Sequence, residues 1–197
     1  MEETFNKEVI VQEYKSRAFV VQLSGDIEMG YITNLIKEIH SLVPSEDDRL
    51  EIHISSYGGD LEAAIYFMNT VKLMFGGNIA TFLLSNAASA AALIFMVGTS
   101  RYVFENSSMM LHTFSMGTFG KATDLHNDVK HNTKRFKRVL KDLFGDSLTK
   151  KEYKKIMSGE DYYLEPEQML DKGIATGLVR FELNNLEETQ QDGEEDV

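Results

Sequence analysis

The stretch LLSNAASAAALIFM, residues 83–96, decides the fold of this chain. It follows the apolar run 79–82, whose bulky and β-branched side chains favour a strand. The pattern predicts a tight turn at Ser85-Asn86 and then a buried helix that ends at Gly98. Every residue from 87 to 92 is small, so neighbouring elements can approach the backbone closely. We therefore expect a strand, a turn and a tightly packed helix.

Ser89 lies near the start of this expected helix. Backbone N–H groups without helical partners point outward there, and the helix dipole favours negative charge. A serine in this place can act as a nucleophile, with the N–H of Ala90 facing the oxyanion. The structural alternative is that Ser85 caps the helix and Ser89 only fills space, since the G-x-S-x-G motif is absent.

Strands and helices alternate along the first half of the chain. Hydrophobic patterning predicts strands at 18–23, 50–55 and 79–82 and helices at 31–42 and 61–75. This order is typical of βαβ crossovers and a largely parallel sheet, so the fold class is α/β. Ligands bind such sheets beyond the carboxyl ends of the strands, where residues 56–59 and 85–89 fall.

The second half begins with a strand pair, 101–104 and 109–113, joined by a turn-prone segment. A flexible segment, 115–120, leads to the longest helix, 122–144. At about 1.5 Å per residue this helix reaches roughly 35 Å, so we expect part of its apolar stripe to need a partner from another chain. Short elements follow, which are helices at 149–157 and from 166 to before Gly173, and extended segments at 161–164 and 174–181.

Composition excludes several classes of protein. The 197 residues suit one domain, and the lack of cysteine excludes disulfides, thiol catalysis and Cys-ligated metals. Neither a secretory signal nor a membrane-spanning apolar run is seen, which indicates a soluble, cytoplasmic protein. Residues 181–197 carry seven acids and no Lys or Arg, and contribute most of the net charge of −11. Nothing in this balance favours binding to nucleic acid or to a membrane.

No cofactor or metal motif is found. Gly120-Lys121 does not complete a phosphate loop, because the motif spacing needs glycine where Ser115 stands and Ser or Thr where Ala122 stands, so ATP would be hydrolysed by another protein. No H-E-x-x-H spacing exists to hold a metal. His112 is the histidine that differs from the other four, because it ends a strand beside a glycine-rich segment. Asp161 starts an extended segment and could orient a histidine, but many other acids compete with it.

Five short segments carry a family likeness: ISSYGG at 54–59, NAASA at 86–90, MMLH at 109–112, GKATD at 120–124 and DYYL at 161–164. In this order and spacing they resemble the Clp protease proteolytic subunit family, the ClpP-like serine peptidases. The likeness covers residues 17–179, most of the chain.

The resemblance implies a crotonase-like α/β head with a protruding handle. The head would comprise residues 17–118 and 151–181, and the handle residues 119–150. Residues 1–16 would form an N-terminal, axial segment, and residues 182–197 an acidic, disordered tail. It also implies a homo-oligomer of heptameric rings, stacked face to face, with the active sites inside.

The resemblance also assigns roles to single residues. Ser89 would be the nucleophile, His112 the general base and Asp161 the group that orients the imidazole. The backbone N–H groups of Gly59 and Ala90 would form the oxyanion hole. Substrate would lie extended along four residues, which are Ser115, Met116, Gly117 and Thr118. No cofactor and no metal are implied.

The leading hypothesis is a serine endopeptidase that cleaves unfolded polypeptides in a ring chamber fed by an AAA+ unfoldase. Three departures bear on it: Tyr57 replaces the family's proline, Gly159-Glu160 replaces an Asp-Arg pair, and the N-terminal segment is short. The last two put the second ring, the axial gate and the unfoldase in question. The alternatives are a phage capsid maturation protease, acting in the host cytoplasm, an inactive structural ring subunit, and a crotonase-type acyl-CoA enzyme.

Overall fold

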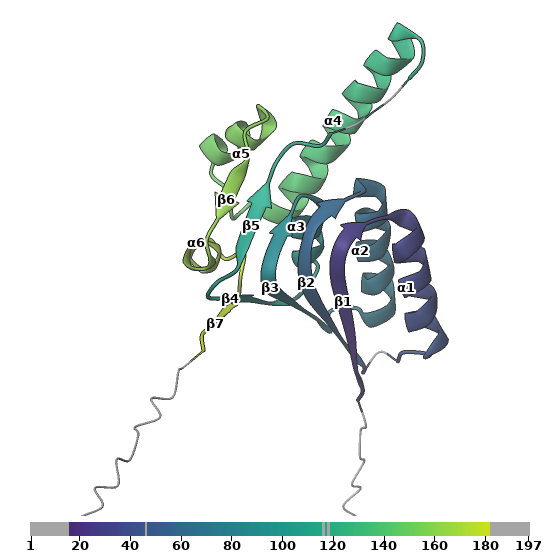
Figure 1. Cartoon of the computed structure of the whole chain (residues 1–197), viewed down its shortest axis with the longest axis vertical. Coiled ribbons are helices and arrows are strands. Elements are labelled where there is room, and N and C mark those ends of the chain that lie inside the picture. The colour runs from purple at the N-terminus through teal and green to yellow at the C-terminus, as the bar shows by residue number, and fades with distance from the viewer. Residues whose placement is uncertain (1–15, 46, 116, 118, 182–197) are drawn as a thin grey trace, which may run out of the picture.

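A seven-stranded, mostly parallel sheet forms the body of the molecule (Figure 1). The computed structural model describes residues 16–45, 47–115, 117 and 119–181. Five parallel strands follow one another across the sheet: β1 (Ala18–Ile27), β2 (Arg49–Gly59), β3 (Ile79–Ala88), β4 (Ser100–Phe104) and β7 (Gly177–Val179). β5 (Ser108–Leu111) pairs in parallel with the end of β3, and β6 (Tyr162–Leu164) adds to β5 in antiparallel direction. The expected α/β class with a largely parallel sheet is confirmed.

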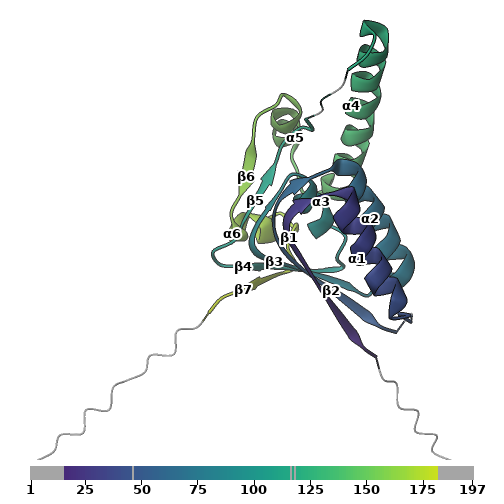
Figure 2. The same ribbon diagram turned by 45° about the vertical axis from the view of Figure 1, so that its right-hand side comes forward.

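The helices α1 (Met29–Ser41), α2 (Leu61–Phe75) and α3 (Ala90–Phe95) pack on one face of this sheet (Figures 1 and 2). Burial alternates along β2, where Leu50, Ile52 and Ile54 are fully buried and the residues between them are half-buried. One face of the strand therefore supplies the core, while the other stays partly open to solvent. The core holds the carboxyl ends of β2 and β3 in fixed positions.

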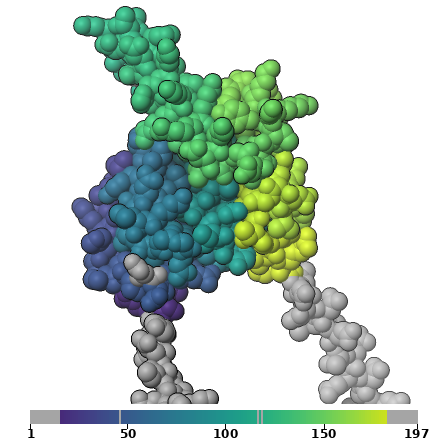
Figure 3. Space-filling view, turned by 180° about the vertical axis from the view of Figure 1, so that it is seen from behind, coloured from purple at the N-terminus to yellow at the C-terminus, as the bar shows by residue number. Residues whose placement is uncertain are grey.

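The remaining helices lie near the last strands. α4 (Ala122–Phe144) buries Phe136, Leu140 and Phe144 near its end, whereas its first half projects beyond the sheet (Figures 1 and 3). Val129 in that half is 47% exposed. α5 (Lys150–Met157) and α6 (Pro166–Asp171) follow beside β6 and β7. The expected partner for the apolar stripe of α4 stays a prediction, as does the division into head and handle.

The helices expected at 61–75 and 122–144 are confirmed with the same bounds. The expected turn at Ser85-Asn86 is wrong, because β3 continues to Ala88. β3 pairs with β4 as far as Leu83, and its last residues pair with β5. The polar residues therefore stay in the sheet while β3 changes its neighbour, and Ser85 does not cap the helix.

The expected strand pair at 101–104 and 109–113 needs a second correction. Both strands exist, but β4 and β5 each pair with β3 in parallel and not with each other. The chain between them moves β5 onto the extension of β3, beyond the end of β4. This arrangement places the residue after β5, His112, near the end of β3.

Candidate active site

Ser89 occupies a sharp junction between β3 and α3. Its backbone has φ 55° and ψ −122°, a region that residues with a side chain rarely adopt, at a cost of about 1–3 kcal/mol. The Ser89 N–H donates to the carbonyl oxygen of Met110 at 2.9 Å, and its own carbonyl accepts from the N–H of Ala92 at 3.1 Å. Its hydroxyl makes no capping bond to the helix. A strained strand-to-helix turn of this kind presents a serine hydroxyl as a nucleophile.

Small residues around Ser89 make this turn possible. A G-x-S-x-G motif has glycine two residues before and two after its serine, and Ala87 and Ala91 hold those places here. Both are fully buried. The alanines are therefore small enough to take the places of the two glycines, and the turn forms although the sequence lacks the motif.

Gly58 packs directly against the Ser89 junction. Its φ is +100°, and a Cβ at this position would lie 2.6 Å from the carbonyl oxygen of Ala88 and 2.8 Å from the Cβ of Ser89. Any side chain here would collide with the backbone that shapes the junction. The end of β2 is thus held against the start of α3 by the lack of a side chain.

A cavity of about 380 Å³ opens beside Ser89. It is bordered by Gly59, Ala90, His112 and Ser115, so five of the residues selected from the sequence share one space. Its large apolar lining residues come from α2, α3, the end of β5, the following loop and α4, and are Leu61, Leu93, Leu111, Phe114, Phe136 and Leu140. Ser89 is half-buried, which leaves its hydroxyl open to this space.

The expected oxyanion hole borders the same cavity. Ala90 is the first residue of α3, where the backbone N–H has no partner within the helix. Gly59 is the last residue of β2, immediately after the glycine that touches Ser89. The backbone groups of both residues therefore border the space into which Ser89 opens.

His112 and Asp161 are set opposite each other by strand pairing. In the register of β5 and β6, Leu111 pairs with Tyr162, and the next residues outward are His112 and Asp161. Asp161 is exposed and does not line the cavity. Within the described part of the chain, no hydrogen bond joins Ser89, His112 and Asp161. The structure brings the nucleophile and base candidates to one cavity, and the acid candidate to the neighbouring strand end.

A network centred on Glu152 of α5 fixes the residue that follows Asp161. Glu152 accepts hydrogen bonds from the Tyr162 hydroxyl at 2.6 Å, from Lys172 Nζ at 2.8 Å and from the Thr149 N–H at 2.8 Å. Partial burial alone would raise the pKa of Glu152, but these bonds outweigh it and lower the pKa to about 2. Burial and the bond to Glu152 raise the pKa of Tyr162. The Thr149–Glu152 spacing of a capping box was the only signal of this network in the sequence.

Of the four residues expected to bind substrate, the structure places one at the cavity. Ser115 lines the cavity and Gly117 does not, while Met116 and Thr118 lie outside the described residues. In the described ranges, no cluster of three potential metal-ligating side chains is found, and no helix is long and apolar enough to cross a membrane. Sequence analysis missed Asp60 and Glu62, which also line the cavity. Their position directly after a strand's carboxyl end was the available signal.

A strained serine turn beside an α/β sheet, with a histidine in the same cavity, is an arrangement typical of serine hydrolases. The model of the Clp protease family matches residues 4–181, and the chain therefore belongs to the Clp protease family. Two relatives are the ATP-dependent Clp protease proteolytic subunits 2 of Chlamydia trachomatis serovars D and A. Each is 25% identical over 179 residues, which cover 87% of this chain and 83% of the relative. The expected family is confirmed, and it supports a ClpP-type peptidase.

Proposed function

We propose that this chain is a serine endopeptidase that hydrolyses peptide bonds in unfolded polypeptides. The observation that carries the proposal is the strained Ser89 turn, which opens into a cavity shared with His112, Gly59 and Ala90. Membership of the Clp protease family supports the same chemistry. A packing serine would gain nothing from a strained backbone, whereas a nucleophile needs its hydroxyl presented in this way.

The reaction follows from the placement of these groups. Ser89 Oγ attacks the substrate carbonyl carbon while His112 takes the hydroxyl proton, and the oxyanion faces the N–H groups of Gly59 and Ala90. The C–N bond then breaks, and His112 gives the proton to the leaving amine. Water attacks the resulting ester as His112 takes its proton, and the acyl group leaves as a carboxylic acid when the proton returns to Ser89.

Asp161 completes the proposal by orienting His112 and stabilising its charged form. The strand register that sets the two residues opposite each other supports this role. Because Asp161 is exposed in the single chain, contacts from a neighbouring subunit would turn its carboxylate toward His112. This account makes activity depend on assembly.

Assembly into heptameric rings is part of the proposal. ClpP-family proteins generally form rings and act on peptides. The exposed apolar residue Val129 on the projecting half of α4 supports a contact with another subunit. A chamber of this kind would be fed by an AAA+ unfoldase in the cytoplasm. Substrate would pass extended along residues 115–118.

Labelling with an alkyl fluorophosphonate tests the proposed function. The full-length protein, Ser89→Ala and the control Ser85→Ala are labelled and then separated on a sizing column. Ser85 is exposed on β3, the strand that leads into Ser89, and among the described residues its hydroxyl donates only to Asn86 Oδ1, at 3.2 Å. We expect labelling of the ring fraction to vanish in Ser89→Ala and to persist in Ser85→Ala. An assembled protein that does not label would instead indicate an inactive structural subunit.

A further inference from the structure

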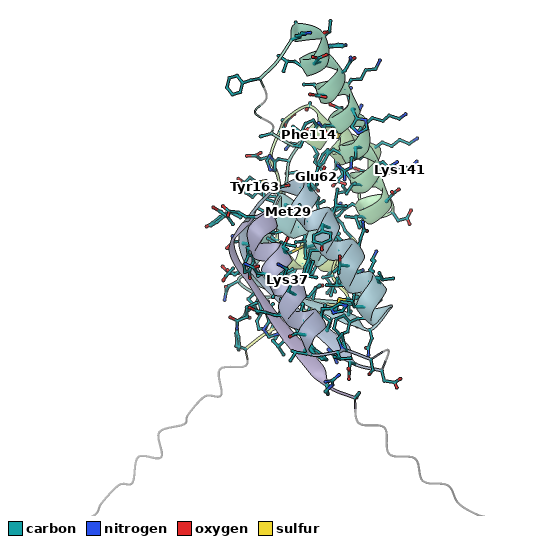
Figure 4. The ribbon with its side chains drawn as sticks, turned by 90° about the vertical axis from the view of Figure 1, so that its right-hand side faces the viewer. Met29, Lys37, Glu62, Phe114, Lys141 and Tyr163 are labelled. Carbon is teal, nitrogen blue, oxygen red and sulfur yellow. The ribbon has the colours of Figure 1, made fainter. Side chains whose placement is uncertain are left out.

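The cavity beside Ser89 combines apolar walls with an acidic, exposed end. The rings of Phe114 and Phe136 lie tilted against each other with centroids 5.9 Å apart, and four leucines complete the apolar lining. Asp60 and Glu62 line the cavity where α2 begins (Figure 4 labels Glu62 and Phe114). Both acids are exposed, and among the residues that line the cavity no Lys or Arg is found.

The two carboxylates are held differently. Asp60 is the N-cap of α2, and its Oδ1 accepts from the N–H of Glu62 at 2.6 Å and from that of Ala63 at 3.2 Å. Its Oδ2 makes no hydrogen bond within the described part of the chain. The capping bonds therefore fix the Asp60 carboxylate at the cavity while one oxygen stays available to a ligand.

Glu62 forms an ion pair with Arg135 of α4. The Glu62 side chain is 52% exposed and that of Arg135 is 26% exposed, so water still reaches the pair. Arg135 does not line the cavity and approaches the carboxylate from outside. Two carboxylates and one guanidinium leave this end of the cavity with a net negative charge.

We infer that this cavity receives the substrate side chain that precedes the scissile bond, and that it selects a basic side chain over an acidic one. The inference rests on the proposed function, because Ser89 sets the place of the scissile bond. Lys and Arg can lay an apolar stem along the cavity walls and keep the charged head at the exposed, acidic end. A Glu side chain would place its carboxylate beside Asp60 and Glu62, where like charges repel. The substrate class is therefore polypeptide cleaved after basic residues.

Equilibrium binding to Ser89→Ala tests this selection without any catalysis. Three acetylated tripeptide amides that differ only in a last residue of Lys, norleucine or Glu are titrated in turn, followed by NMR. We expect the Lys peptide to bind about tenfold more tightly than the Glu peptide, with norleucine between them. A tenfold ratio corresponds to about 1.4 kcal/mol.

Charge variants in the Ser89→Ala background show which residues set the ratio. Asp60→Asn keeps the helix cap, since Asn and Asp cap equally well, and removes only the charge. Asp60→Asn and Glu62→Gln should each lower the Lys-to-Glu ratio about threefold, and Arg135→Gln should raise it. Glu38→Gln, on the exposed side of α1, is the control for loss of one negative charge. Arg180→Gln, which breaks the exposed pair with Glu167, is the control for loss of an Arg–Glu pair.

Equal affinity for the Lys and Glu peptides would overturn the inference. So would a Lys-to-Glu ratio that neither Asp60→Asn nor Glu62→Gln changes, and so would the absence of binding by all three peptides. Fluorophosphonate labelling of the unmodified chain is scored separately. Failure of labelling alone refutes the proposed catalytic function, and failure of peptide selection alone refutes the role of the cavity.

Discussion

Gly58→Ala should greatly lower the reactivity of Ser89 while lowering the stability of the protein only moderately. The added Cβ would lie 2.6 Å from the Ala88 carbonyl oxygen, 2.8 Å from the Ser89 Cβ and 3.0 Å from the Ala90 nitrogen. All three atoms belong to the turn or its flanks, so relief of the clash must move Ser89, the proposed nucleophile, or the N–H group of Ala90. A displacement near 1 Å at a reacting group costs about 100-fold in rate.

The stability cost can be worked from the same geometry. A side chain at φ +100° costs about 1–3 kcal/mol before any clash is counted. With the clash included we expect a loss of about 2–4 kcal/mol in the free energy of unfolding. At 2–4 °C per kcal/mol for a domain of this size, the melting temperature should fall by about 4–16 °C. The protein should remain folded at room temperature.

Gly173→Ala is the matched control for backbone strain. Gly173 has φ +68°, and a Cβ there would meet no heavy atom within 4 Å. It should cost about 1 kcal/mol and leave the rate of fluorophosphonate labelling within twofold of the unmodified protein. Calorimetry and labelling at equal protein concentration measure the two effects. If Gly58→Ala labels as fast as Gly173→Ala, the packing of Gly58 does not shape the nucleophile and the argument fails.

Two further predictions follow from the same site. Ser89→Gly should lose labelling as Ser89→Ala does, but calorimetry should show it about 1 kcal/mol more stable than Ser89→Ala. The reason is that relief of about 1–3 kcal/mol of backbone strain exceeds the cost of about 0.5–1 kcal/mol for glycine's freedom in the unfolded chain. Equal stability of the two variants would mean that the turn is not strained. Glu152→Gln should lower the free energy of unfolding by about 1–3 kcal/mol at neutral pH. Because the pKa of Glu152 is lowered to about 2 on folding, the stability it adds is present above pH 4.5 and is lost as the pH falls toward 2, so the unmodified protein and the variant should converge in acid denaturation.

The long, strongly periodic helices could be predicted well from the sequence. The bounds of α2 and α4 agree with expectation because each helix combines regular apolar spacing with a clear stop, Gly76 for α2 and Gly145 for α4. The nucleophile segment was harder. Ser85 and Asn86 have the composition of a turn, yet pairing with β5 keeps Asn86 in the sheet and moves the true turn to Ser89. Tertiary pairing overrode a local propensity there.

The cavity could be predicted only in outline. The carboxyl ends of β2 and β3 were recognised as the place for a site, and the residues from both ends do meet there. The contribution of α4 was not foreseen, because nothing local indicates that Phe136 would close a space beside Ser89. The ion pair between Arg135 and Glu62 was hidden for the same reason, since 73 residues separate its partners.

The strand β5 couples the parts of the proposed catalytic group. Its Met110 carbonyl accepts the N–H of Ser89, and its end leads directly into His112. β6 pairs with the other edge of β5 and sets Asp161 opposite His112, while Glu152 ties β6 to α5 and, through Lys172, to the end of α6. A shift of β5 would therefore move the base relative to the nucleophile, and a shift of β6 would move the acid relative to the base. In the proposed assembly, contacts that a neighbouring subunit makes on β6 and α5 would control activity through this one short strand, although neither element lines the cavity.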